Sequence, residues 1–394
     1  MNKKLRLHEI PHLRALAFIG VVVQHAIGMF SRSEGVQASD LMGLGVLFNL
    51  VKFAVPLFVF MTGLVIFYNY YEELKVGSYL VKRVREVIVP YLAFTVYYYY
   101  FWGADHAAHT WREFPSVFLT GSGAYHLWFV AMIFQFYLLY PVFRRAFQKL
   151  QPVMSRERVL ISFLVVLVGV FIWGTEWVIG HSGQWKSDVF GIRGVLHHLD
   201  RTFVVWYLYF VLGGVAAMSI GKWRAWVARM QRWNLYVFGL TLGWVTLELS
   251  KGIQGGTMDL GVSHSFKASM ILFTLSAFVL LYQVAMRMSV RENWATKVSN
   301  LLGKYSYGTY LMHVFFLDKL YYQVNKWMPG VFPVGKVAVA VVGCVGLSLV
   351  ATMVISKVPV VGSLLVGTAG GRKKKVGSVE AVPAGPSGLK GGGV

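Results

Sequence analysis

An arginine and a histidine share one face of the first apolar segment. The segment reads HLRALAFIGVVVQHAIGMF and contains Arg14 and His25. Their spacing along an α-helix leaves the two side chains within about 20° of one face and about 16 Å apart along the axis. An imidazole titrates near neutral pH, and its neutral form tolerates low dielectric, so His25 is a candidate general base. The competing interpretation is a structural histidine that hydrogen-bonds another helix.

A second group of cations precedes the third apolar segment. It lies in LVKRVREVIVPYLAF and includes Lys82, Arg83 and Arg85. The planar guanidinium group binds phosphate in a bidentate manner, so these side chains could hold a phosphate-bearing ligand. Basic residues at the end of a spanning helix are also expected from membrane topology alone. The functional interpretation gains weight because Arg14 is predicted on the same cytoplasmic side, where a phosphate-bearing cytosolic cofactor would arrive.

These side chains belong to a chain whose composition predicts an integral membrane protein. Of its 394 residues, 56% are hydrophobic and only 14% are charged, and the mean hydropathy is +0.55. Apolar runs recur with the length of about 20 residues that spans a hydrocarbon core. We therefore predict an all-α, polytopic bundle of about ten spanning helices, near residues 11–30, 45–69, 86–103, 126–143, 159–180, 203–219, 234–250, 269–286, 301–323 and 333–356. The stretch 333–365 is longer than one span needs, which indicates an additional short element.

The distribution of Lys and Arg predicts the orientation of the bundle. Cytoplasmic loops of membrane proteins are enriched in these residues. With both termini in the cytoplasm, most of the 38 Lys and Arg residues fall in inside segments, so the net charge of +21 reflects topology and not nucleic-acid binding. Residues 1–366 are predicted to form the transmembrane domain. Residues 367–394 are predicted to form a disordered, basic, Gly/Pro-rich cytoplasmic tail, whose RKKK run contacts membrane lipids.

Two further histidines are candidates for lining the same site. His126 begins the fourth predicted span at its outer end, and His313 lies within the ninth. Each could line the site, His313 by orienting a substrate, or each could have a structural role. His313 and Asp318 also form an H-x4-D pattern, but residues five apart on a helix diverge by about 140°. Coincidence is therefore the better interpretation of that pattern.

The sequence argues against metal and cysteine chemistry. Cys344 is the single cysteine and lies in the last apolar run, so we expect no disulfide and no thiolate metal site. His106 with His109, and His197 with His198, resemble metal-ligand spacing. They lack a further carboxylate or cysteine set, so we expect no metal site there. The sequence contains no G-x-S-x-G motif of a serine hydrolase.

Six segments stand in a distinctive order within residues 10–355. They are HLRALAFIGVVVQHA, FAVPLFVFMTGLVIFY, KRVREVIVPYLAF, YHLWFVAMIFQFYLLYPVF, WYLYFVLGG and YSYGTYLMHVFF. In this order the chain resembles the membrane acyltransferase-3 family, which includes bacterial O-acetylating enzymes for surface polysaccharides. The resemblance implies a multi-pass protein of the bacterial cell membrane. It also implies transfer of an acetyl or succinyl group from cytoplasmic acyl-CoA (acetyl-CoA or succinyl-CoA) to a carbohydrate hydroxyl. The acceptor would be an exopolysaccharide, a cell-wall glycan or a lipid-linked sugar, with acyl-CoA as co-substrate and no bound cofactor.

The resemblance also implies roles for individual residues. His25 would deprotonate the acceptor hydroxyl, and Arg14 would help to hold the donor. The family often has an Arg-x-x-Arg pair before the third helix; Arg83 fits its first position, but Glu86 stands at the second, with Arg85 one residue earlier. The string RVREVIVPY is closer to the branch that contains intercellular-adhesion proteins of poly-N-acetylglucosamine biosynthesis, which implies succinylation or export of the polymer. An exporter or flippase is therefore the alternative, although we detect no inverted repeat of the transporter type.

Overall fold

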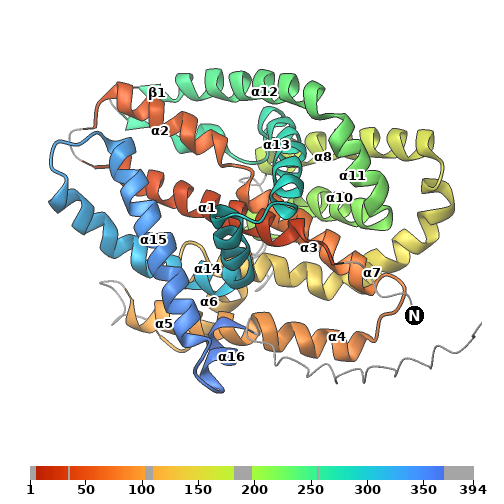
Figure 1. Ribbon diagram of the computed structural model, residues 1–394, viewed down its shortest axis with the longest axis horizontal. Helices are drawn as coiled ribbons and strands as arrows, with labels where there is room; N and C mark the ends of the chain where they lie inside the picture. The colour runs from red at the N-terminus through yellow and green to blue at the C-terminus, as the bar shows by residue number, and fades with distance from the viewer. Residues whose placement is uncertain (1–5, 34–35, 103–109, 182–197, 255–256, 368–394) are drawn as a thin grey trace, which may run out of the picture.

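The computed structural model describes residues 6–33, 36–102, 110–181, 198–254 and 257–367, and in this part of the chain it is almost entirely helical (Figure 1). Its strands, among the described residues, are one antiparallel pair of two residues each, β1 (Ile253–Gln254) and β2 (Thr257–Met258). The longer helices, in chain order, are α1 (Glu9–Phe30), α2 (Ala38–Leu50), α3 (Ala54–Tyr70), α4 (Val76–Arg83), α5 (Val89–Phe101), α7 (Trp128–Met154), α8 (Glu157–His181), α10 (Tyr207–Met218), α11 (Ile220–Arg229), α12 (Gln231–Lys251), α13 (Ala268–Ser289), α14 (Trp294–Trp327) and α15 (Pro333–Ile355). The shorter ones are η1 (Val84–Ile88), α6 (Phe114–Thr120), η4 (Leu199–Arg201), η5 (Phe203–Val205), η6 (Leu260–Ser263) and α16 (Val361–Val366). The predicted all-α class is confirmed.

The predicted spans fall mainly on helices, and several helices have the composition of a membrane span. Five stretches are long and apolar enough to cross a bilayer: Glu9–Phe30, Ala38–Tyr70, Glu157–His181, Ala268–Ser289 and Pro333–Ile355. The other predicted spans lie on helices that are shorter or less apolar, so the number of ten spans and the cytoplasmic termini stay predictions. The additional short element predicted at the end of the last apolar stretch is α16.

The second predicted span, near 45–69, is not one continuous helix. Helix α2 ends at Leu50 and α3 begins at Ala54, so residues 51–53 form a break within the apolar stretch. The side-chain amide of Gln24 in α1 donates a hydrogen bond of 2.6 Å to the carbonyl oxygen of Val51. The same carbonyl oxygen also accepts a 3.1 Å hydrogen bond from the backbone N–H of Ala54, so Gln24 adds a link from α1 to the break.

The third predicted span contains a widened helical turn. Helices α4 and α5 are continuous through η1, which has π-helical hydrogen bonding. Pro90, near the start of α5, has no N–H to donate to the carbonyl of Glu86 one turn earlier. The lost bond explains why the ladder widens here, and such π-turns are frequent at functional sites. The helix begins at Val76, about ten residues before the predicted span.

Glycines allow the central helices to approach closely. A Cβ atom at Gly63 of α3 would lie 2.2 Å from the carbonyl oxygen of Phe210, and one at Gly213 of α10 would lie 2.1 Å from that of Phe60. Such close backbone contact is typical of helix pairs in membranes, where small residues form the interface. In the same way, a Cβ at Gly303 of α14 would lie 1.9 Å from the carbonyl oxygen of Pro11.

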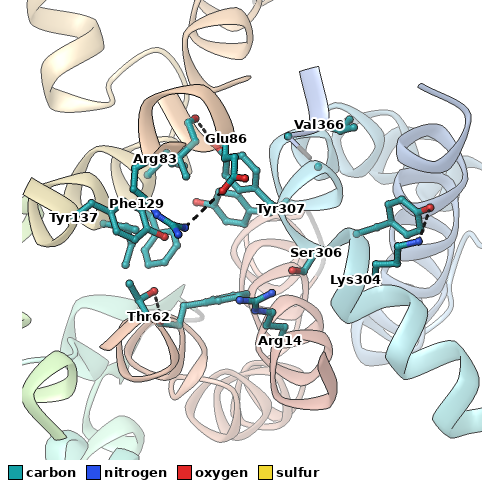
Figure 2. Close-up of a pocket in the computed structure, with 18 residues that line it drawn as sticks. Arg14, Thr62, Arg83, Glu86, Phe129, Tyr137, Lys304, Ser306, Tyr307 and Val366 are labelled. Atoms are coloured by element: carbon teal, nitrogen blue, oxygen red, sulfur yellow. Dashed lines mark hydrogen bonds and ion pairs between the residues drawn. The ribbon is translucent and has the colours of Figure 1, made fainter. Parts of the chain in front are cut away.

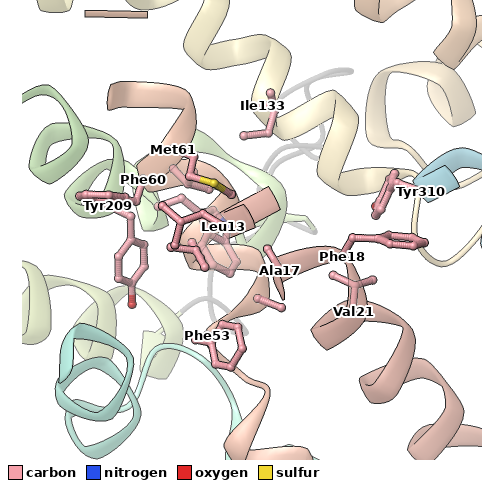
Figure 3. Close-up of a cluster of buried hydrophobic side chains, with 14 of the residues drawn as sticks. Leu13, Ala17, Phe18, Val21, Phe53, Phe60, Met61, Ile133, Tyr209 and Tyr310 are labelled. Atoms are coloured by element: carbon pink, nitrogen blue, oxygen red, sulfur yellow. The ribbon is translucent and has the colours of Figure 1, made fainter. Parts of the chain in front are cut away.

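Helix α1 lies at the centre of the buried core. It packs against α3, α13, α14 and α15, and Figure 1 shows it between α12 on one edge of the molecule and α4 on the other. Figure 3 shows its apolar side chains among those of α3, α7, α10 and α14; the labelled residues are Leu13, Ala17, Phe18, Val21, Phe53, Phe60, Met61, Ile133, Tyr209 and Tyr310. Arg14 and His25 therefore project from the helix with the most central position in the fold.

Candidate active site

A cavity of about 320 Å³ opens between helices that lie far apart in the sequence. Its walls come from α1, α3, α4 with η1, α7, α14 and the end of α16 (Figure 2). It is lined by Arg14, Phe58, Thr62, Arg83, Glu86, Val87, Phe129, Val130, Ile133, Tyr137, Lys304, Tyr305, Ser306, Tyr307, Gly308, Tyr310, Val366 and Gly367. Three of these side chains are basic and one is a carboxylate, so the cavity has a net positive charge.

Arg14 reaches this cavity without a protein partner. Figure 2 shows Arg14 and Arg83 approaching the cavity from different sides. Within the described residues, the Arg14 guanidinium makes no hydrogen bond and no ion pair. A charged group inside a fold is costly unless a partner compensates it. An unpaired guanidinium that faces a cavity is therefore suited to an anionic ligand.

Arg83 is held in place by tyrosines. Its Nη2 donates a 3.1 Å hydrogen bond to the Tyr70 hydroxyl, and its guanidinium lies over the rings of Tyr79 and Tyr137, 5.5 Å and 5.4 Å from the centroids. Only 16% of the Arg83 side chain is exposed. Cation–π contacts and the hydrogen bond orient the group toward the cavity without neutralising its charge.

Glu86 lies beside Arg83, where the family pattern expects a second arginine. Its Oε2 is 3.7 Å from Nη1 of Arg83. The widened turn of η1 carries this carboxylate, and Tyr307 of α14 donates a 2.6 Å hydrogen bond to the carbonyl oxygen of Val87 in the same turn. Arg85 is exposed and does not line the cavity. Arg83 thus lines the cavity and Arg85 does not, although the sequence predicted that both bind the donor.

Lys304 is a cation of the cavity that sequence reasoning missed. It lies on α14 and lines the cavity beside Tyr305, whose hydroxyl is 3.4 Å from Nζ. In the sequence, Lys304 is one of several basic residues before the ninth predicted span, and no local pattern distinguishes it from the others. Only the packing of α14 against α1 places it in the wall of the same cavity as Arg14.

The three candidate histidines form one cluster. The rings of His25 and His313 stack with centroids 5.4 Å apart and an interplanar angle of 24°. The ring of His126 meets that of His313 edge-on, with centroids 5.0 Å apart. These side chains come from α1, from the residues just before α7, and from α14. The structure brings the three rings together, and their roles in a site stay predictions.

The hydrogen bonds of the cluster leave several nitrogen atoms free. Nδ1 of His313 donates a 2.5 Å hydrogen bond to the carbonyl oxygen of Tyr310, so Nε2 carries no proton in the neutral ring. Within the described residues, that Nε2 and both ring nitrogens of His126 are buried without a partner. His25 is only half-buried, whereas His126 and His313 are buried. His25 is therefore the histidine that an incoming molecule can reach.

Tyr310 connects the cationic cavity to the histidine cluster. It lines the cavity, and its ring lies 5.5 Å from that of His126 and 5.4 Å from that of His313. Its hydroxyl donates a hydrogen bond to the backbone carbonyl of His126. A cavity with a net positive charge and a group of basic nitrogens thus lie next to each other. That arrangement can hold a charged donor and accept a proton close by.

The described residues contain no group of three His, Cys, Asp or Glu side chains arranged to hold a metal ion. His106, His109 and His197 lie outside the described residues. The thiol of Cys344 is buried and donates a 3.2 Å hydrogen bond to the carbonyl oxygen of His313.

Comparisons with known proteins identify the family of this chain and several of its relatives. The sequence model of a family described as an acyltransferase domain, acyltransferase 3, matches residues 7–353. The chain is 23% identical over 320 residues to "Putative membrane-bound acyltransferase YfiQ" of Bacillus subtilis, covering 79% of this chain and 82% of that protein. It is 22% identical over 334 residues to "Probable poly-beta-1,6-N-acetyl-D-glucosamine export protein" of Staphylococcus aureus, covering 82% and 85%. The protein of the same name from Staphylococcus epidermidis is 23% identical over 331 residues, covering 82% and 84%. No solved structure shows significant similarity to the chain.

Proposed function

Because this chain belongs to the acyltransferase-3 family of bacterial multi-pass membrane proteins, we propose that it transfers an acetyl or succinyl group from acyl-CoA to a carbohydrate hydroxyl. The acceptor is a cell-surface glycan or its lipid-linked precursor. The observation that carries the proposal is the position of Tyr310, which contacts both the cationic cavity and the two buried histidines.

In this proposal the cavity holds the phosphates of the donor. Arg14 and Arg83 provide guanidinium groups for charge-assisted hydrogen bonds, and Lys304 adds a third positive charge. The thin pantetheine arm then passes Tyr310 toward the histidine cluster and presents the thioester near His25. Along α1, Arg14 and His25 are about 16 Å apart, a separation that an extended pantetheine arm can span. Arg85, which lies outside the cavity, stays a prediction from the sequence.

The transfer step needs one base and no covalent enzyme intermediate. The acceptor oxygen attacks the thioester carbonyl carbon while its proton passes to a ring nitrogen of His25. The carbon–sulfur bond then breaks, and the departing thiolate takes up the proton from the imidazolium. The products are the acylated glycan and free CoA, and His25 is neutral again. His126 and His313 line the site and supply further nitrogen acceptors next to the base.

The experiment that tests this function measures label transfer in membranes. Labelled acetyl-CoA and succinyl-CoA are supplied to membranes that carry the wild type, His25→Ala or His181→Ala. His181 is the last residue of α8, and its Nδ1 lies 2.8 Å from the carbonyl oxygen of Trp177 in the same helix. Because it lies outside the cluster, it serves as the control histidine. We expect label in the glycan for the wild type and the control, and none for His25→Ala at equal protein level. The better donor identifies the acyl group.

Export of a glycan is the second candidate function, because several relatives carry that description in their names. If neither donor labels any glycan, and deletion of the protein lowers the amount of glycan outside the cell, the acyltransferase proposal is wrong and export takes its place. If the protein transfers the acyl group in isolated membranes and exports no glycan, the export function in the relatives' names does not apply to this chain.

A further inference from the structure

The histidine cluster has a second side, opposite the cationic cavity. On α14, the residues from Lys304 to Gly308 line the cavity, His313 comes about 8 Å further along the axis, and Asp318 another 8 Å beyond it. Helix α7 runs the other way: Ile133 and Tyr137 line the cavity, whereas residues 125 and 126 precede its first turn. The order along both helices places Tyr125 and Asp318 beyond the histidines.

Tyr125 lies directly on His25 at this second side. The two rings meet edge-on with centroids 4.8 Å apart and an interplanar angle of 64°. Tyr125 is nevertheless 53% exposed, although a large aromatic side chain gains free energy from burial. An exposed aromatic ring in contact with the candidate base is placed to touch whatever reaches that base from this direction.

Asp318 provides a carboxylate near the same position. It lies within electrostatic range of Tyr125 and is half-buried. Within the described residues its carboxylate accepts no hydrogen bond and forms no ion pair. The neighbouring Lys319 acts on this carboxylate through its charge but forms no ion pair with it, and its Nζ lies over the ring of Trp102, 5.0 Å from the centroid. A half-buried carboxylate without a donor is suited to hydroxyl or ammonium groups of a ligand.

We propose that Tyr125 and Asp318 form the subsite that binds the acyl acceptor. This inference rests on the proposed function and adds the class of acceptor: a sugar that is neutral or carries an amino group at this position. The Tyr125 ring packs against the apolar face of the sugar, and the Asp318 carboxylate accepts hydrogen bonds from its hydroxyl or ammonium groups. The donor and the acceptor then reach His25 from opposite sides. An acidic sugar is disfavoured by repulsion from Asp318.

The test uses full-length protein in membranes with three soluble acceptors: an N-acetylglucosamine oligomer, a glucosamine oligomer and an oligogalacturonate. Initial rates of acyl transfer are measured for the wild type, Tyr125→Ala, Tyr125→Phe and Asp318→Asn. We expect the two uncharged or amino acceptors to be used and the galacturonate to be rejected. Tyr125→Ala and Asp318→Asn should each raise the acceptor KM about tenfold and leave the donor KM unchanged. Tyr125→Phe, which keeps the ring, should stay within about twofold of the wild type.

Tyr322→Ala is the matched control. Like Tyr125, Tyr322 is an exposed tyrosine, with 64% of its surface accessible, and it lies near the end of α14. An unchanged acceptor KM in both Tyr125→Ala and Asp318→Asn would refute the subsite and leave the proposed function standing. Preference for the galacturonate by the wild type would refute the acceptor class. If the wild type transfers no label to these acceptors or to endogenous glycan, the proposed function itself is wrong, and the subsite is wrong with it.

Discussion

The imidazole of His25 stacks on the imidazole of His313, with their centroids 5.4 Å apart. One residue lies in the first helix and the other in the thirty-four-residue helix near the end of the described chain. Protonation of one imidazole disfavours protonation of the other, because two positive charges at this distance repel strongly in a medium of low dielectric. A positive charge on both rings at once is therefore strongly disfavoured.

Replacing His313 should slow the chemical step. His313→Phe keeps an aromatic ring against His25 but removes the free Nε2 acceptor. We expect kcat to fall about tenfold, which corresponds to the loss of one hydrogen bond of about 1.4 kcal/mol, with the donor KM unchanged. Initial-rate kinetics with labelled acyl-CoA measure both constants. A rise in the donor KM with unchanged kcat would assign His313 to donor binding instead.

Arg14 and Arg83 should determine the affinity for the donor. Each lines the cavity, whereas Arg85 is exposed outside it. Charge-assisted hydrogen bonds contribute about 1.5–3 kcal/mol, so Arg14→Ala and Arg83→Ala should raise the KM for acyl-CoA by about 10- to 100-fold. Arg85→Ala should change it less than about twofold. An equal rise in the KM for acyl-CoA in Arg83→Ala and Arg85→Ala would show that both arginines bind the donor, as the sequence predicts. The donor site would then extend beyond the cavity.

Glu86 should weaken donor binding in the native protein. Its carboxylate lies 3.7 Å from Arg83 and is the single acidic group among the residues that line the cavity. Glu86→Gln keeps the size of the side chain and removes a negative charge. Because phosphates are repelled by that charge, we expect a donor KM about threefold lower, within the range of partly exposed charge interactions. A higher KM would mean that Glu86 orients Arg83 and does not oppose the donor.

The ion pair between Glu9 and Arg224 should stabilise the bundle. Arg224 contacts both carboxylate oxygens of Glu9 at 2.8 to 2.9 Å, and the Tyr282 hydroxyl donates a 2.7 Å hydrogen bond to the same carboxylate. Glu9 is 2% exposed. Arg224→Met should lower the stability by about 2 kcal/mol, since the buried carboxylate loses its positively charged partner and both donor nitrogens of that partner. Thermal unfolding in detergent measures this, and Glu9→Gln combined with Arg224→Met should cost less than the sum of the two single changes.

The close contact of α3 with α10 should not tolerate even one methyl group. In Gly213→Ala the new Cβ would lie 2.1 Å from the carbonyl oxygen of Phe60. We expect a loss of about 2 kcal/mol or more in stability, because neither backbone can move without disturbing the core. Gly243→Ala in α12 is the control, since no atom lies within 4 Å of its added Cβ. It should be neutral or slightly stabilising, and equal loss in both variants would exclude close packing as the cause.

Several features of the chain could be predicted because they depend on local spacing alone. Apolar runs of spanning length predicted where helices lie, and a separation of eleven residues predicted that Arg14 and His25 share one face of α1. The identity of the family followed from motifs of the same kind, read in order along the chain. These properties need only the geometry of a single helix.

The tertiary structure decided which distant side chains meet. The second predicted span is broken at residues 51–53, where Gln24 of another helix donates a hydrogen bond to the carbonyl of Val51. The tertiary structure placed Lys304 in the wall of the same cavity as Arg14, and it gathered His126 and His313 with His25 in one cluster. Each of these relationships depends on how helices pack, and helix packing is determined by close contacts such as Gly303 with Pro11. The sequence by itself determined the helices and the reactive groups, whereas only packing between distant helices determined the site that they form.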